Sequence, residues 1–309
     1  MQNQTSGATP ILIASVLWGT TGTASSLAPS GAPAAAVGSA GLAFGGLLLF
    51  LSTRGARSLP AACGAAERWL LVLGAVAVAG YPVTFYPAVA RTGVAVATVI
   101  ALGSAPVFTG LLAWLIGRDR PANRRLCATV GAVLGCTALV FGPELTDGAA
   151  PVDAIGVLLA TLAGLSYAVY ALISGRLITR GHSSGSVMGV MFGGAALLVL
   201  PVLAAAGTQW LLTWRGTAVA LHLALFTTFL AYRLFGHGLR HASAQTATTL
   251  TLAEPAVAAL LGVAVLGERL PLLSWSGLAV LALALVLLTV PARPPGRGER
   301  VEIVHGGAA

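Results

Sequence analysis

The sequence predicts an all-α integral membrane protein with ten transmembrane helices in two inverted five-helix repeats. Of its 309 residues, 57% are hydrophobic and 8% are charged, which leaves too little polar surface to cover a soluble globule of this size. The length accommodates about ten spans of roughly 20 apolar residues each. An apolar stretch around Pro106 recurs as a similar stretch around Pro255, so one hydrophobic pattern occurs twice along the chain.

Short breaks rich in Gly, Pro and Arg separate the apolar segments, as is typical of packed antiparallel helices. The expected spans are residues 9–28, 33–52, 69–89, 93–116, 126–142, 154–174, 186–206, 216–238, 243–266 and 272–290. The first repeat comprises residues 1–148 and the second residues 149–290. Residues 291–309 lack hydrophobic periodicity, so we expect them to form a disordered cytoplasmic tail.

The distribution of arginines predicts the orientation in the membrane. The chain has no lysine, and most arginines lie in loops after even-numbered spans or in the tail: Arg54, Arg57, Arg68, Arg118, Arg120, Arg124, Arg125, Arg176, Arg180, Arg240, Arg293, Arg297 and Arg300. The opposite side holds Arg91, Arg215 and Arg269. The positive-inside rule therefore places both termini in the cytoplasm. Because each repeat has five spans, the two copies point in opposite directions, a geometry that favours alternating access.

The net charge, the N-terminus and the cysteines indicate no other class of protein. The net charge of +8 follows membrane topology and forms no patch, so we expect no nucleic-acid partner. Residues 1–10 lack the basic residues of a secretory leader. Cys63, Cys127 and Cys136 are odd in number, and two fall in one expected helix, so we expect no disulfide framework, zinc site or cofactor.

One segment of the second half resembles a known family. Residues 252–288 read LAEPAVAALLGVAVLGERLPLLSWSGLAVLALALVLL, with a proline-broken helix, a Gly-Glu turn and a Trp-x-Gly helix start. This pattern is similar to the second repeat of EamA-type transporters of the drug/metabolite transporter superfamily. The first half matches more loosely, through residues 18–19 and 103–106, and departs at residues 117–119, where Gly-Arg-Asp replaces Gly-Glu-Arg.

The resemblance implies a central cavity lined mainly by spans one, three, four, six, eight and nine. It also implies a secondary transporter in the cytoplasmic membrane, most of whose relatives export small metabolites, amino acids or drugs. We therefore expect an amino-acid-like or drug-like substrate and a monomer or homodimer, with uptake as the alternative direction. The fold alone identifies neither substrate nor direction.

Glu254, in the middle of span nine and directly before Pro255, is the first candidate site residue. A carboxylate at that depth costs several kcal/mol unless it is paired, hydrated or protonated. We expect Pro106 and Pro255 to break their helices and free backbone groups for a substrate or ion. Glu254 is accordingly a candidate for binding a proton or a cationic group. The alternative is that it caps the broken helix.

Span eight carries His222, Arg233 and His237, which at about 100° per residue fall within a stripe of roughly 60°. Arg233 is a candidate for binding a substrate carboxylate or pairing with Glu254, and otherwise snorkels to the cytoplasmic interface. His237 is a candidate proton relay, and His222 is expected near the outer surface.

Aromatic residues cluster on spans expected to face inward, where rings with polar tips suit amphipathic solutes. The candidates are Trp18, Tyr81, Phe85, Tyr86, Tyr167, Tyr170 and Tyr232. Each taken alone fits ordinary helix packing or an interfacial belt equally well. Glycine pairs at residues 41 and 45, 131 and 135, and 189 and 193 predict close helix packing, with dimerisation through span five as the alternative.

Two other functional classes are disfavoured. An intramembrane enzyme would have to use His222, His237 and Glu254, yet no known catalytic spacing such as His-Glu-x-x-His connects them. An ATP-driven pump needs a Gly-x-x-x-x-Gly-Lys loop, which a chain without lysine cannot provide.

Overall fold

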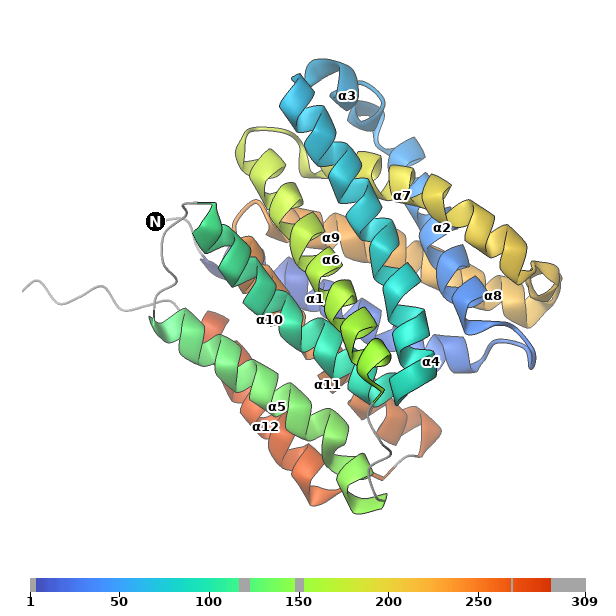
Figure 1. Cartoon of the computed structure of the whole chain (residues 1–309), viewed down its shortest axis with the longest axis vertical. Coiled ribbons are helices and arrows are strands. Elements are labelled where there is room, and N and C mark those ends of the chain that lie inside the picture. Colours follow the sequence, from blue (N-terminus) through green and yellow to red (C-terminus); the bar gives the residue numbers. More distant parts are fainter. Residues whose placement is uncertain (1–3, 117–122, 148–152, 268, 290–309) are drawn as a thin grey trace, which may run out of the picture.

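The computed structural model describes residues 4–116, 123–147, 153–267 and 269–289 (Figure 1). Within these ranges the chain is almost entirely helical and contains no strand. The helical segments are α1 (Gln4–Ser26), α2 (Ala34–Ser52), η1 (Arg54–Ala56), α3 (Leu59–Ala62), α4 (Ala65–Leu115), α5 (Asn123–Asp147), α6 (Ala154–Thr179), α7 (Ser184–Ala206), η2 (Gln209–Leu212), α8 (Trp214–His222), η3 (Leu223–Leu230), α9 (Ala231–Gly238), α10 (Ala244–Leu250), α11 (Ala253–Leu261), η4 (Gly262–Leu266) and α12 (Leu272–Thr289).

Eight helical segments of the described chain are long and apolar enough to cross a membrane. This confirms the predicted class, an all-α multi-pass membrane protein. The exact number of ten spans stays a prediction. The expected tail, residues 291–309, lies outside the described residues.

Helix α4 covers two of the expected spans. Its 51 residues correspond to about 77 Å of ideal helix, more than twice the roughly 30 Å of the hydrocarbon core. The chain reverses between its two arms at Gly93, whose φ of 82° and ψ of 161° interrupt the helix. Only glycine adopts this conformation without strain, so a single residue replaces the loop that the sequence predicts.

Short polar side chains start several helices. The side chains of Asp153, Ser183, Thr213 and Ser243 each accept a hydrogen bond from the backbone N–H three residues later. Such caps satisfy donors that have no partner inside the helix. The N–H of Gly156, 2.7 Å from the Asp153 carboxylate, holds the pKa of Asp153 below its usual range. This cap is therefore present at neutral pH and is lost as the pH falls through that lowered pKa.

Expected span nine is broken into two half-helices, α10 and α11. Pro255 has no N–H with which to bond the carbonyl of Thr251, and the N–H of Glu254 donates to that carbonyl instead at 2.9 Å. This tighter bond separates the two halves at residues 251–252.

The expected break at Pro106 is absent, because α4 continues through it with helical backbone angles. The Thr109 hydroxyl there donates to a neighbouring carbonyl, that of Ala105 at 3.0 Å or that of Pro106 at 2.9 Å. Helix α4 also contacts the broken helix, since the hydroxyls of Thr109 and Thr248 lie 3.0 Å apart. The two proline-containing segments are therefore neighbours, although only one of them is broken.

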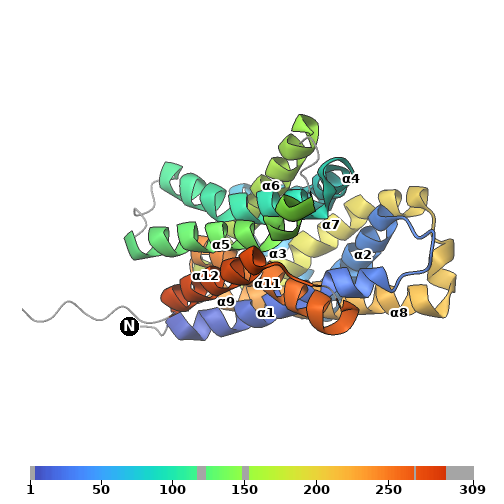
Figure 2. The same cartoon turned by 90° about the horizontal axis from the view of Figure 1, so that it is seen from below.

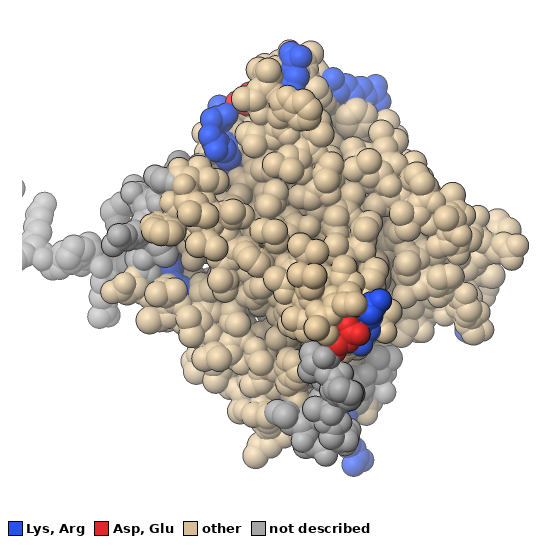
Figure 3. Space-filling view, in the orientation of Figure 1, with Lys and Arg blue, Asp and Glu red and all other residues tan. Residues whose placement is uncertain are grey.

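The surface fits a lipid environment. Figure 3 shows a broad uncharged face, with charged side chains gathered above it and in a smaller group below it. Large apolar side chains stand exposed on many helices, among them Leu212 at 88% and Leu283 at 71%. Four tryptophans, Trp69, Trp114, Trp214 and Trp275, are also exposed, which is typical of side chains at a membrane interface. A lipid bilayer is the solvent that such a surface requires.

Glycines allow close helix packing within the chain. Figures 1 and 2 show α5 beside α12, where Gly135 faces Gly277. A Cβ atom added at Gly135 would lie 2.5 Å from the backbone nitrogen of Leu281. Gly41 and Gly45 contact span eight, and Gly189 and Gly193 contact α2, so the predicted internal packing is confirmed for these pairs.

We expect Gly135→Ala to lower the free energy of unfolding by about 1–3 kcal/mol relative to Gly22→Ala, because backbone atoms block the new methyl group. Gly22 lies in α1 with nothing within 4 Å of the added Cβ, so it is the matched control. Thermal unfolding of the purified variants in detergent measures the difference. Equal stability of the two variants would contradict the close α5–α12 packing.

Candidate functional site

A cavity of about 200 Å³ lies between segments of the two halves of the chain. In α1, α2 and both arms of α4, its lining residues lie mainly in the half of each helix farther from the arginine-rich end, whereas those of span eight and α6 lie mainly in the nearer half. They are Trp18, Thr21, Gly38, Gly41, Leu42, Val78, Tyr81, Pro82, Phe85, Tyr86, Thr98, Leu102, Tyr167, Tyr170, Phe192, Leu223, Thr227, Thr228, Tyr232 and Glu254.

Most of the sequence-predicted site residues meet in this cavity. All seven aromatic candidates and Glu254 line it, and they come from α1, α4, α6, α9 and α11. Two further helices line the cavity that the family resemblance did not predict: α2, with Gly38 and Gly41, and α7, with Phe192. The cavity is therefore assembled from at least seven helices, and no local motif describes it.

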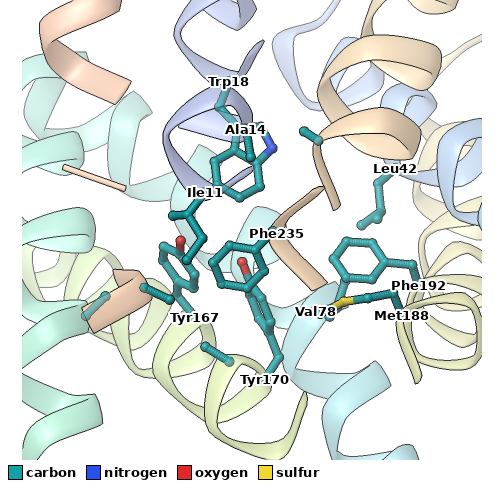
Figure 4. Close-up of a cluster of buried hydrophobic side chains, with 14 of the residues drawn as sticks. Ile11, Ala14, Trp18, Leu42, Val78, Tyr167, Tyr170, Met188, Phe192 and Phe235 are labelled. Carbon is teal, nitrogen blue, oxygen red and sulfur yellow. The ribbon is translucent and has the colours of Figure 1, made fainter. Parts of the chain in front are cut away.

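Stacked and tilted rings form the aromatic wall (Figure 4). The rings of Tyr167 and Tyr170 stack with their centres 5.0 Å apart. The ring centre of Tyr232 lies 3.9 Å from that of Phe192 and 4.9 Å from that of Trp18. Stacked and tilted arrangements are those that aromatic rings prefer, so these contacts stabilise the wall. An aromatic wall with several hydroxyl tips suits flat or amphipathic solutes.

Phe235 belongs to a packed layer of side chains next to the aromatic wall. It is fully buried, and its ring contacts those of Trp18 at 5.6 Å and Tyr167 at 6.3 Å (Figure 4). Ile11 and Met188, which are also fully buried, lie in the same cluster. This packed layer lies between the cavity and the arginine-rich end of the bundle.

A hydrogen bond joins the two halves of the chain across the cavity. The indole N–H of Trp18 donates to the backbone carbonyl of Thr227 at 2.8 Å. Thr227 lies in η3, a π-helical segment, and π-helical turns are often found at functional sites. Trp18 thus binds a carbonyl in the irregular part of span eight.

A second hydrogen-bonded chain supports the break in span nine. The hydroxyl of Tyr167 donates to the hydroxyl of Thr251 at 2.8 Å, and Thr251 donates to the carbonyl of Thr248 at 2.9 Å. Thr251 lies just before the second half-helix, which carries Glu254. These bonds hold α11 in place relative to α6, so Glu254 stands at a defined position in the cavity wall.

Glu254 is the one charged side chain among the residues that line the cavity. The ion pairs formed within the described ranges join Arg91 with Asp153 and Glu67 with Arg180 and His182, so none includes Glu254. The carboxylate thus faces a cavity whose other polar groups are hydroxyls and an indole. A proton or a cationic ligand group would neutralise it there.

The residues of the polar stripe predicted on span eight do not line the cavity. Arg233 is exposed, with its guanidinium carbon 5.3 Å from the Phe229 ring centre, and it is not among the cavity residues. His237 is also exposed, and its ring lies 5.7 Å from that of His241. The physical reason is η3, because a π-helix turns less per residue than the 100° assumed and rotates the residues that follow it.

His222 lies before the π-helical segment and contacts α1. Its Nε2 atom is 2.9 Å from the hydroxyl of Thr20, and it does not line the cavity. Thr227 and Thr228 replace the expected stripe as the polar groups that span eight presents to the cavity. Two adjacent threonines in the middle of span eight are a signal in the sequence that could have indicated them.

A multi-pass helical bundle with an aromatic-lined cavity between its halves has the architecture of a membrane transporter. The chain belongs to the EamA-like transporter family, whose sequence pattern it matches twice, over residues 5–141 and 154–290. It is thus a transporter of the drug/metabolite transporter superfamily, as the resemblance in residues 252–288 predicts.

Two similar bacterial proteins are named as transporters. The chain is 40% identical to the uncharacterized transporter YwfM of Bacillus subtilis, over 96% of each chain. It is 28% identical to the threonine/homoserine exporter RhtA of Escherichia coli, over 77% of this chain and 76% of the relative. A crystal structure with 19% sequence identity superposes with a TM-score of 0.73 and covers 94% of this chain and 98% of its own, which shows a shared fold.

We expect Trp18→Phe to destabilise the protein by about 1–3 kcal/mol, because the carbonyl of Thr227 then stays buried without its indole donor. Trp69→Phe is the matched control, since Trp69 is 73% exposed. Thermal unfolding of both purified variants measures the effect. A Trp18→Phe variant as stable as Trp69→Phe would show that this bond does not hold the π-helical segment.

Proposed function

We propose that the protein is a secondary transporter that exports a small organic metabolite, amino-acid-like or drug-like, across the cytoplasmic membrane by alternating access. The observation that carries this proposal is the cavity, which both halves of the chain line and into which one carboxylate, Glu254, projects. Membership of a transporter family and the similarity to an amino-acid exporter support it. In this mechanism the two repeats have inverted topology and rock around the cavity.

The arrangement of charges supports an outward-facing state. Under the positive-inside rule, the arginine-rich end that holds Arg54, Arg68, Arg176 and Arg180 faces the cytoplasm. Through α1, α2 and α4 the cavity extends into the opposite half of the bundle, and the layer around Phe235 packs on its cytoplasmic side. Both chain termini are then cytoplasmic, and the cavity faces the outside.

The charge in the cavity narrows the class of substrate. Because Arg233 is outside the cavity, no arginine of the lining is available to pair with a substrate carboxylate. Glu254 instead suits an ammonium or another cationic group, with the tyrosine rings providing cation–π contacts. Hydroxyls of Thr21, Thr98 and Thr227 can accept or donate hydrogen bonds to the remaining polar groups.

We further propose that Glu254 exchanges a proton for the cationic substrate. A carboxylate in an aromatic cavity is stable when neutralised, so binding of a proton and binding of a cation at Glu254 compete. Such competition is the minimal requirement for antiport. Each change between the two states of the transporter then carries either a proton or the substrate across the membrane, and not both. An intramembrane enzyme built on His222, His237 and Glu254 is disfavoured, since neither histidine lines the cavity.

Glu254→Gln is expected to abolish the dependence of transport on a pH gradient. The reason is that an amide side chain neither takes up a proton at physiological pH nor carries a charge that attracts a cation. Arg233→Gln is the control, and it is expected to transport at the wild-type rate from its exposed position. The measurement is solute flux into vesicles containing the purified protein, with and without a pH gradient. Wild-type pH dependence in Glu254→Gln removes Glu254 from the coupling mechanism.

A second experiment identifies the transported substrate and the direction of transport. Metabolites released by cells with and without the protein should differ in one or a few cationic or zwitterionic compounds. Faster release in cells that have the protein supports export, whereas faster depletion from the medium indicates uptake. Equal metabolite profiles under conditions of verified expression contradict the exporter assignment.

A further inference from the structure

A cluster of three metal-ligating side chains lies outside the cavity, between the α3–α4 corner and the turn that joins α6 to α7. Cys63 ends α3, Glu67 lies in the first turn of α4, and His182 precedes α7. Their ligand atoms all lie within 4.8 Å of one another. Cys63 and Glu67 belong to the first repeat and His182 to the second, so the cluster joins the two repeats.

Two distances within the cluster are close to those between ligands around one small cation. The Sγ atom of Cys63 is 3.9 Å from Nε2 of His182, and that nitrogen is 3.1 Å from Oε2 of Glu67. Tetrahedral zinc, with bonds of about 2.3 Å to sulfur and about 2.0 Å to nitrogen or oxygen, places its ligands roughly 3.3–3.6 Å apart. Only small side-chain movements separate the present arrangement from such a site.

The surrounding arginines bind other atoms of the cluster, so the three ligand atoms contact one another. Arg180 binds the other carboxylate oxygen, Oε1 of Glu67, at 3.2 Å, so Oε2 stays directed at His182. Arg68 donates from its Nε to the backbone carbonyl of Cys63 at 2.9 Å and fixes the loop that carries the thiol. Nε2 of His182 faces both the sulfur and the carboxylate, yet one ring nitrogen carries at most one proton and cannot donate to both.

We propose that Cys63, Glu67 and His182 form a binding site for a thiophilic divalent cation, Zn²⁺ in the first instance, at the arginine-rich end of the bundle. A thiolate, an imidazole and a carboxylate are the ligand types that zinc prefers, and three protein ligands leave the fourth position to water. On binding, the thiol loses its proton to solvent and the unprotonated Nε2 of His182 takes up the cation.

The site has a consequence that rests on the proposed function. A cation bound by both repeats stabilises the arrangement in which their arginine-rich ends are in contact, by mass action on that state alone. Zinc would then slow the opening of the cavity toward that end. Binding of the metal itself is independent of transport, so a failure of either proposal can be recognised separately.

The test is titration of the purified, untagged protein with Zn²⁺ and with Co²⁺. A Cys127→Ser background removes the exposed cysteine, which leaves the buried Cys136 as the other thiol besides Cys63. In this background we expect one equivalent of Zn²⁺ to bind, a rise in melting temperature on addition of Zn²⁺, and a thiolate-to-Co²⁺ charge-transfer absorption band with Co²⁺. Cys63→Ser should abolish the band, and Cys63→Ser and His182→Gln should each weaken Zn²⁺ affinity at least tenfold.

His241→Gln is the matched control, because His241 lies beside His237 and outside the cluster, and it should bind as the background does. The absence of a thiolate band in the folded Cys127→Ser protein overturns the proposal without requiring any cluster variant to fold. Zn²⁺ affinity that survives His182→Gln, or that falls equally in His241→Gln, overturns it as well.

Discussion

Every polar backbone group in the hydrocarbon core of a bilayer has to find its partner within the protein, because no water is present there. This constraint explains why the described chain is almost entirely helical, and it also limits where a helix can be interrupted. At the break before α11, the N–H of Glu254 bonds the carbonyl that Pro255 leaves free. In span eight, the Trp18 indole binds a carbonyl of the π-helical segment. The irregular backbone is thus tolerated where it borders the cavity.

The same irregularities determine what the cavity presents to a solute. The break in span nine brings Glu254 to the wall, and the Tyr167 and Thr251 hydroxyls hold the half-helix that carries it. The π-helical segment turns Thr227, Thr228 and Tyr232 inward and leaves Arg233 exposed. A cavity lined by one carboxylate and no guanidinium favours cationic over anionic groups. Two local departures from the α-helix therefore decide the chemistry of the site.

Glycine has a comparable influence on the packing. Gly135 and Gly277 let α5 and α12 approach until backbone atoms touch, and Gly45 gives span eight the same proximity to α2. Without a hydrophobic force between helices in lipid, such contacts provide much of the association energy. Gly93 acts differently, because its positive φ reverses α4 within one residue. The two arms then lie close enough to present Tyr81, Tyr86 and Thr98 to one cavity.

The sequence by itself determined the membrane class, the duplicated pattern, the family and most of the aromatic lining, because apolar spans, prolines and aromatic residues act through local composition and spacing. It did not predict that Pro106 leaves its helix intact or that α2 and α7 line the cavity, and it left open whether Arg233 lines the cavity or lies at the surface. Those features depend on the helical register after η3 and on which helices pack together. The cluster of Cys63, Glu67 and His182 is equally a product of tertiary structure, since its members come from different repeats and share no sequence motif.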